Sequence, residues 1–175
     1  MPLERKNAVI SKGKPMTLLG NEIRTGSRAP DFTVLDNDSQ PVTLASFAGQ
    51  TKILLSLPSL DTSVCDVEAR EFSRRASELE NTAILIVSVD LPSAQKRWCG
   101  AADVHNLVTV SDHRDTSFGL AYGVLIKELR WLCRASFVVT RADEVTYVEY
   151  LPELRLQPSY DAIMQAAKEA AAARL

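Results

Sequence analysis

The order of apolar segments predicts an α/β domain with a central mixed β-sheet flanked by helices. Three observations predict it: an apolar run at 52–57 with a helical pattern from 63, a β-branched run at 82–89, and two alternating segments before an Ala-rich C-terminal helix. A strand, a helix and a strand in this order form a right-handed crossover between parallel strands. A chain of 175 residues suits one domain, residues 1–175, with a sizeable core.

The N-terminal part predicts two hairpins. Residues 1–25 are expected to form a β-hairpin extension, with strands at Ala8–Ile10 and Met16–Leu19 around the turn sequence SKGKP. A second pair of short strands, Phe32–Leu35 and Val42–Leu44, flanks the turn cluster DNDSQP and precedes a short helical turn.

The middle of the chain carries the strongest strand signals. Lys52–Leu57 is apolar at successive positions, which favours a central strand buried on both faces. Thr82–Val89, TAILIVSV, predicts a second buried parallel strand. Between them, the helix from Ser63 is expected to face the sheet through an apolar stripe made of Val64, Val67, Phe72, Ala76 and Leu79.

The C-terminal half completes the expected sheet. The predicted elements are a short helix over AQKRWC, a strand at Val108–Val110, helical turns at Thr116–Tyr122, a hairpin of Ala135–Thr140 with Val145–Leu151, and a helix over Pro158–Leu175. The summed order is β-α-β followed by β-β-α, with an N-terminal extension. This order matches a thioredoxin-like fold.

Composition argues against several classes of function. Lys and Arg number 20 against 22 Asp and Glu, a net charge of −2, and no block of like charge occurs, so we expect no nucleic-acid partner and no membrane partner. The N-terminus has no apolar core of signal-peptide length, so a cytoplasmic location is expected. Three cysteines are too few for a secreted disulfide scaffold and indicate redox, catalytic or structural thiols.

Cys65 occupies the position where a strand passes into a helix. Thr62 or Ser63 can cap the free backbone N–H groups of the first turn, and Asp66 and Glu68 are the acidic residues that a helix start favours. Unpaired N–H groups and the positive end of the helix dipole stabilise a thiolate over a thiol. A cysteine in this turn is therefore biased toward its reactive form.

The residues around Cys65 carry a family resemblance. Pro58, Thr62 and Cys65 stand as P-x-x-x-T-x-x-C in PSLDTSVC, which resembles the active-site motif of the peroxiredoxins. The segments DLPSAQKRWCGAAD, SDHRDTSFGLAYGV and VTYVEYLPEL extend the similarity over nearly the whole chain, to the thiol peroxidase branch of that family. The resemblance implies that the Cys65 thiolate attacks a peroxide O–O bond, that the Thr62 hydroxyl holds thiolate and substrate, and that Pro58 shields the pocket.

Further roles are implied by the same resemblance. Cys99 occupies the position of the resolving cysteine, which closes a disulfide with Cys65, and Arg134 matches the arginine of the active site. The resemblance also implies hydrogen peroxide and organic hydroperoxides as substrates, thioredoxin as electron donor, a homodimer and no cofactor. Two positions depart from the branch: Ser93 replaces a usual phenylalanine, and Cys133 replaces a small residue without a thiol.

Other readings of these residues remain open at this stage. Arg134 could be a surface residue that begins a strand, and Cys133 could be a structural thiol or a competitor of Cys99. A metal site of the cysteines with His105 and His113 lacks any C-x-x-C or H-x-x-x-H pair. The alternative functions are a redox-inactive thioredoxin-like binding module and a protein thiol–disulfide oxidoreductase, although the latter is expected to carry the absent C-x-x-C motif.

Overall fold

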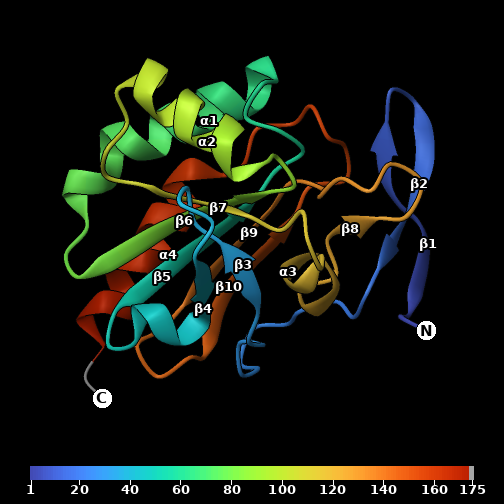
Figure 1. The fold of residues 1–175 in the computed structure, drawn as a ribbon. Coiled ribbons are helices and arrows are strands. Elements are labelled where there is room, and N and C mark those ends of the chain that lie inside the picture. The colour runs from blue at the N-terminus through green and yellow to red at the C-terminus, as the bar shows by residue number, and fades with distance from the viewer. Residues whose placement is uncertain (174–175) are drawn as a thin grey trace.

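A seven-stranded mixed sheet forms the centre of the molecule (Figure 1). The computed structural model describes residues 1–173. The strand order is β10-β9-β5-β6-β7-β3-β4. The strands are β3 (Thr33–Leu35), β4 (Pro41–Thr43), β5 (Thr51–Ser56), β6 (Thr82–Ser88), β7 (Val108–Ser111), β9 (Ala135–Val139) and β10 (Val145–Tyr150). The expected α/β class and mixed sheet are confirmed.

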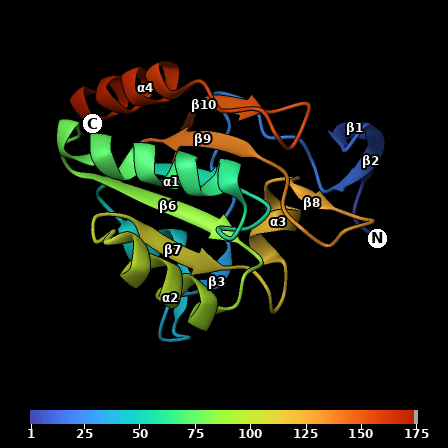
Figure 2. The same cartoon turned by 90° about the horizontal axis from the view of Figure 1, so that it is seen from above.

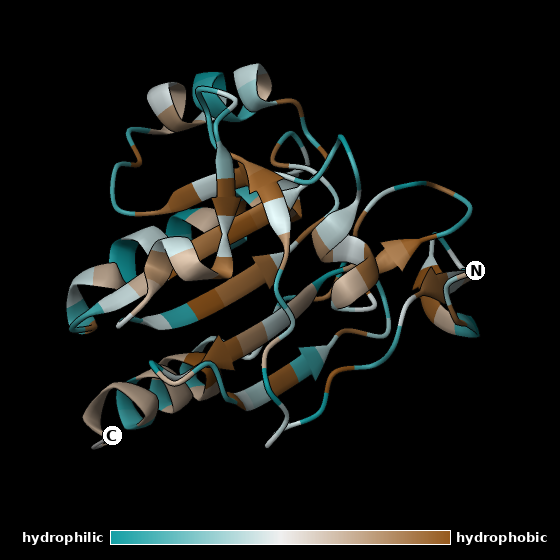
Figure 3. Cartoon of the chain, turned by 60° about the horizontal axis from the view of Figure 1, so that its bottom comes forward, coloured by the Kyte–Doolittle hydropathy of each residue, from teal (hydrophilic) through white to brown (hydrophobic). Residues whose placement is uncertain are grey.

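The central strands are the parallel ones. β5 pairs in parallel with β6, and β6 with β7, whereas β9 runs antiparallel to β5. All six residues of β5 are buried, including the polar Thr51, Lys52 and Ser56, so the predicted burial of this strand on both faces is confirmed. Figure 3 shows hydrophobic residues concentrated in these strands and hydrophilic ones in the surrounding loops.

Helices divide unequally between the two faces of the sheet. The helical segments are α1 (Ser63–Arg75), α2 (Pro92–Ala102), α3 (Ser117–Ala121), α4 (Tyr160–Ala172) and the 3-10 turns η1 (Leu44–Phe47) and η2 (Ala76–Glu78). Buried residues of α1, α2 and α4 form one core cluster with the residues of β5 and β6 that point toward these helices. The opposite face packs on α3 and the N-terminal region (Figure 2). None of the described helices is both long and apolar enough to cross a bilayer.

The expected N-terminal hairpin is present as β1 (Glu4–Ser11) and β2 (Lys14–Leu19). A strand that the sequence analysis missed, β8 (Leu125–Ile126), pairs with β2 and makes a second sheet of order β1-β2-β8. Gly20 follows β2 with φ +99°, and a Cβ atom there would lie 2.1 Å from the carbonyl oxygen of Leu120. This close approach requires glycine and fixes the hairpin against the segment around α3.

The predicted buried face of α1 is confirmed at Phe72, with Ala76 and Leu79 packed against the same core cluster, but it is wrong at Val67. Val67 is 53 % exposed, whereas the fully buried residues of the helix are Cys65, Glu68, Ala69 and Phe72. Their spacing of i, i+3, i+4 and i+7 is a regular helical face. Apolarity alone missed Cys65 and Glu68, because their side chains are a thiol and a carboxyl group whose partner is Arg134, the residue before β9.

The helix that carries Cys99 is longer than expected. It begins at Pro92, a favoured first helical residue, and continues through Gly100 to Ala102. Asp103 ends it in the left-handed conformation, with φ +54°. Cys99 therefore lies in the last turns of α2 and not at its end.

Candidate active site

Cys65 lies in the first turn of α1, directly after the loop that leaves β5. Its side chain is fully buried, and its Sγ accepts a hydrogen bond from Nη2 of Arg134 at 3.1 Å. Thr62 is the N-cap residue of α1, and its carbonyl oxygen accepts the backbone N–H of Asp66 at 3.0 Å. The sulfur therefore sits at the positive end of a helix and beside a guanidinium group.

The pairing of β9 with β5 places Arg134 beside Cys65. β9 begins at Ala135, which pairs with Ser56 at the end of β5, so Arg134 lies where β5 turns toward Cys65. The guanidinium group is buried and also donates to the carbonyl oxygen of Leu154 from Nη2 at 3.2 Å and from Nε at 3.4 Å. The structure thus contradicts the reading of Arg134 as an ordinary surface residue.

Glu68 is the residue of this site that the sequence analysis misinterpreted. It was expected to act as an acidic residue at the helix start, but its carboxylate is fully buried and accepts a hydrogen bond from Nη1 of Arg134. Burial raises the pKa of Glu68 to about 7, although Arg134 acts to lower it. The spacing of three residues from Cys65 was the available signal, because residues i and i+3 share a helix face.

Cys65 and Glu68 both contact one buried cation, the guanidinium group of Arg134. Burial acts to lower the pKa of Arg134, but Glu68 and Cys65 together raise it above its ordinary value. The second carboxyl oxygen of Glu68, Oε1, has no hydrogen-bond partner in the described part of the chain. Glu68 therefore acts on Cys65 only through Arg134, which it holds between the carboxylate and the sulfur.

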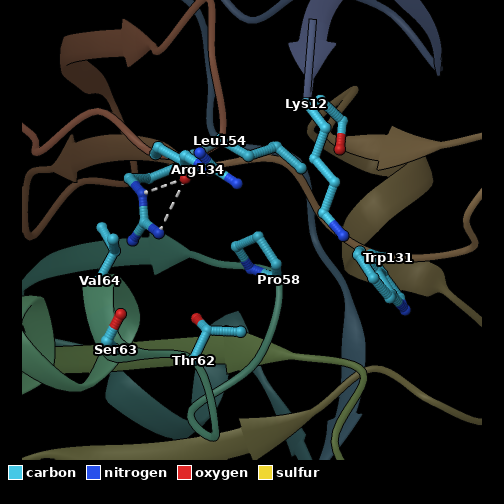
Figure 4. A pocket seen from close by; sticks show the side chains of 10 residues that line it. Lys12, Pro58, Thr62, Ser63, Val64, Trp131, Arg134 and Leu154 are labelled. Carbon is cyan, nitrogen blue, oxygen red and sulfur yellow. Dashed lines mark hydrogen bonds between the residues drawn. The ribbon is translucent and has the colours of Figure 1, made fainter. Parts of the chain in front are cut away.

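Pro58 and Thr62 line a pocket together with Arg134 (Figure 4). The hydroxyl of Thr62 donates to the carbonyl oxygen of Ser59 at 3.0 Å and makes no capping bond, so the expected side-chain cap at Thr62 is wrong. The pocket has a volume of about 340 Å³. Its other lining residues are Ser11, Lys12, Ser63, Val64, Trp131, Leu154 and Arg155. Cys65 lies behind this wall, since its sulfur contacts Arg134.

Cys99 is not brought together with Cys65. Its Sγ lies 3.3 Å from Oγ1 of Thr109 in β7 and 3.9 Å from Nδ2 of Asn37. Cys65 contacts Arg134 at β9, and strands β5 and β6 lie between β9 and β7. All three cysteines are free thiols.

Cys133 belongs to the opposite face of the sheet. It packs in the core cluster around β8 and α3, whereas Cys65 packs in the cluster of α1, α2 and α4. Complete burial raises the pKa of Cys133 to about 12, so it is a protonated thiol at neutral pH. His105 and His113 do not join the cysteines in a site, because residues 1–173 contain no cluster of three potential metal ligands.

Known proteins share both this sequence and this architecture. The model of the Redoxin family matches residues 24–164. A thiol peroxidase from Halalkalibacterium halodurans is 53 % identical over 163 residues, which cover 93 % of this chain and 98 % of that protein. The chain belongs to the Redoxin family and to its thiol peroxidase branch.

Solved structures agree with this thiol peroxidase assignment. A peroxiredoxin-like protein from Aquifex aeolicus superimposes with a TM-score of 0.87 at 35 % identity, covering 94 % of this chain and 97 % of that one. A thiol peroxidase from Chromobacterium violaceum gives 0.84 at 25 % identity, covering 92 % and 95 %. The predicted thioredoxin-like fold is confirmed, and the chain is a thiol-dependent peroxidase, an oxidoreductase.

Proposed function

We propose that Cys65 is the peroxidatic cysteine of this enzyme and Cys99 its resolving cysteine. The observation that carries the proposal is the contact of 3.1 Å between the sulfur of Cys65 and the guanidinium group of Arg134, at the first turn of a helix. Cationic and dipolar groups of this kind stabilise a thiolate and place donors near the reacting sulfur.

In the first step the Cys65 thiolate attacks the terminal oxygen of a hydroperoxide. The O–O bond breaks, an S–O bond forms, and the leaving oxygen departs as water or an alcohol after taking up a proton, which leaves Cys65 as a sulfenic acid. Thiolate formation alone supplies only part of the rate, because an unperturbed thiol is already about 3 % ionised at pH 7. Arg134 supplies donors to the oxygen on which charge develops, and the hydroxyl of Thr62 supplies another once it rotates away from the carbonyl oxygen of Ser59.

The pocket supports both hydrogen peroxide and organic hydroperoxides as substrates. A single water-sized molecule occupies only about 30 Å³ of liquid volume, far below the pocket volume of about 340 Å³. Pro58, Val64, Trp131 and Leu154 give the pocket apolar walls, and Trp131 is 45 % exposed at the surface. An alkyl or aryl group attached to the peroxide can therefore lie against these walls while the O–O bond points toward Arg134.

In the second step Cys99 condenses with the Cys65 sulfenic acid. Disulfide formation needs Cα atoms about 5.5–6 Å apart, but the two thiols contact partners on β9 and β7. β9 and β7 are three strand spacings apart in the sheet, and at about 4.8 Å for each spacing these two strands lie about 14 Å from each other. Both the first turn of α1 and the part of α2 that carries Cys99 must therefore unwind locally for the two sulfurs to meet.

In the third step a dithiol partner exchanges with the disulfide and restores both thiols. We propose thioredoxin as this partner, a homodimer as the working assembly and the cytoplasm as the location, on the strength of the family assignment. The sulfur of Cys65 carries the electrons, so the cycle requires no cofactor.

The two alternative functions find less support. An inert binding module has no need of a buried cation on its cysteine, and a protein thiol–disulfide oxidoreductase has no C-x-x-C pair here.

A non-reducing tryptic peptide map after one equivalent of hydroperoxide tests these roles. Cleavage after Arg70, Arg97, Arg114 and Arg130 places Cys65, Cys99 and Cys133 in separate peptides. We expect one bridge, between Cys65 and Cys99, and none after Cys65→Ser. Unmodified thiols would support the binding module instead, and oxidised Cys65 without a bridge would show that an external thiol resolves it.

A further inference from the structure

The residues next to the two cysteines are bonded to each other. Asp66 follows Cys65, Trp98 precedes Cys99, and Nε1 of Trp98 donates to Oδ1 of Asp66 at 2.8 Å. Nε of Arg70 donates to the other carboxylate oxygen of Asp66 at 2.9 Å, and its guanidinium lies over the Trp98 ring, 5.9 Å from the centroid. These three side chains, Asp66, Arg70 and Trp98, form a clasp between α1 and α2, which lie side by side in Figure 1.

The clasp is well placed to be strong. The indole of Trp98 is buried, with 9 % of the residue exposed, and its single donor has a charged acceptor. Hydrogen bonds to charged groups are stronger than those between neutral groups, and a buried indole N–H without a partner is costly. Arg70 further binds α2 by donating to the carbonyl oxygen of Ala102 at 3.4 Å.

The clasp opposes the movement that disulfide formation requires. Cys65 faces Arg134 and Cys99 faces Thr109, in opposite directions along the sheet, so each cysteine must leave its helical position. Asp66 shares the first turn of α1 with Cys65, and Trp98 shares the turn of α2 with Cys99. Unwinding either turn separates the indole from the carboxylate.

We propose that Asp66 and Trp98 are positioning residues whose hydrogen bond must break before Cys99 resolves oxidised Cys65. This inference rests on the proposed roles of the two cysteines. In the resolving step the S–O bond of the Cys65 sulfenic acid breaks, the S–S bond forms, and hydroxide leaves with the Cys99 thiol proton as water. A second peroxide molecule competes by oxidising the waiting sulfenic acid to sulfinic acid. The clasp thus sets how long Cys65 stays exposed to overoxidation.

Trp98→Phe tests the clasp, because it keeps an aromatic ring and removes only the N–H donor with the outer part of the indole. We expect disulfide formation after one equivalent of peroxide to become about tenfold faster, equivalent to about 1.4 kcal/mol. The peroxide concentration that converts half of Cys65 to sulfinic acid rises by the same factor. The rate constant of the first step stays within twofold, since Cys65, Thr62 and Arg134 keep their contacts. Rapid-quench alkylation with mass spectrometry measures all three quantities.

Two further variants separate a specific effect from general loosening of the fold. Asp66→Asn keeps an acceptor oxygen and is expected to accelerate the disulfide about threefold. Adding it to Trp98→Phe should give less than the product of the two separate effects, because both weaken the bond between Asp66 and Trp98, and only the contact with Arg70 is lost in addition. Ser73→Ala is the matched control, since it removes a hydrogen bond of 2.7 Å from α1 to Asn106, beyond α2 and away from both cysteines. It should leave the disulfide rate unchanged.

The outcomes distinguish this inference from the proposed function. If the unaltered enzyme forms no Cys65–Cys99 disulfide, the proposed function fails and the clasp fails with it. If the disulfide forms but Trp98→Phe leaves its rate unchanged or lowers it, only the clasp is overturned. Equal acceleration by Ser73→Ala would also overturn it, because that result reports overall stability. If Trp98→Phe does not fold, Asp66→Asn gives the same decision by the same measurement.

Discussion

Replacing Arg134 by methionine should separate the chemistry of the site from its stability. The substitution removes the cation that contacts both Cys65 and Glu68 while keeping an unbranched apolar side chain. Loss of a donor aimed at the developing charge reduces an enzyme's rate by about 10²–10³-fold. We expect a loss of that size in the second-order rate constant with peroxide, measured on the high-pH plateau where Cys65 is fully ionised.

The cost in stability should be smaller than the burial of the ion pair suggests. Removing one partner of a buried pair costs about 3–5 kcal/mol. Glu68, however, already has a pKa of about 7 while Arg134 lowers it, so without Arg134 it becomes protonated and neutral at pH 7. The carbonyl oxygen of Leu154 also loses its donors, which costs about 1 kcal/mol. We expect Arg134→Met to lose about 2–3 kcal/mol at pH 7 and more at pH 9, where Glu68 must ionise.

The double variant Glu68→Met/Arg134→Met provides the decisive comparison. Replacing both partners by apolar side chains should leave a loss of about 1 kcal/mol and remove the extra loss at pH 9, because no buried carboxyl remains. The loss of rate should be unchanged. Urea unfolding at both pH values and stopped-flow kinetics measure these quantities. A double variant that recovers the rate, or a single variant that loses less than tenfold, would refute the role given to Arg134.

Three further predictions concern the remaining groups. Cys99→Ser should consume one equivalent of peroxide to form the Cys65 sulfenic acid and, with excess peroxide, a second equivalent to form sulfinic acid, without a bridge to Cys133, as read by intact-mass and peptide analysis. Cys133→Ser should retain peroxidase activity and lose about 1–3 kcal/mol in urea unfolding, because a buried hydroxyl replaces a thiol; unchanged stability would contradict the burial argument. The folded-state pKa of Glu68, about 7, lies above its ordinary value of 4.5, so its contribution to stability is present at low pH and lost as pH rises between these values. The stability of the enzyme relative to Glu68→Gln should therefore fall by about 3 kcal/mol over that range, and a flat difference would disprove the raised pKa.

Most strands could be predicted because a run of consecutive apolar or β-branched residues indicates a buried strand. Thr82–Val89 is such a segment, and β6 covers all but its last residue. β8 could not be found in this way, because two residues carry no periodicity and its pairing is with β2, more than a hundred residues earlier. Its formation depends on the position of α3, which only the folded chain defines.

The site was predictable where residue type and local position suffice. A cysteine that follows a strand and begins a helix indicates a reactive thiol, and Thr62 and Pro58 lie within seven residues of it in the sequence. Glu68 was misjudged because its charge suggested a solvated position near the helix start. Its burial depends on Arg134, 66 residues away in sequence, and no local pattern encodes that pairing.

The register of β9 decides which residue faces Cys65. Side chains alternate between the two faces of a strand, and here Arg134 enters the face of α1 while Cys133 enters the opposite core. A shift of one residue would exchange them, placing a protonated thiol beside Cys65 and a guanidinium group in an apolar core. The pairing of Ser56 with Ala135, and the bond of 2.8 Å from the Ser56 hydroxyl to the carbonyl oxygen of Cys133, fix the register at this end of the strand. The same β5 strand that leads into the Cys65 loop thus also selects the cation that the sulfur contacts.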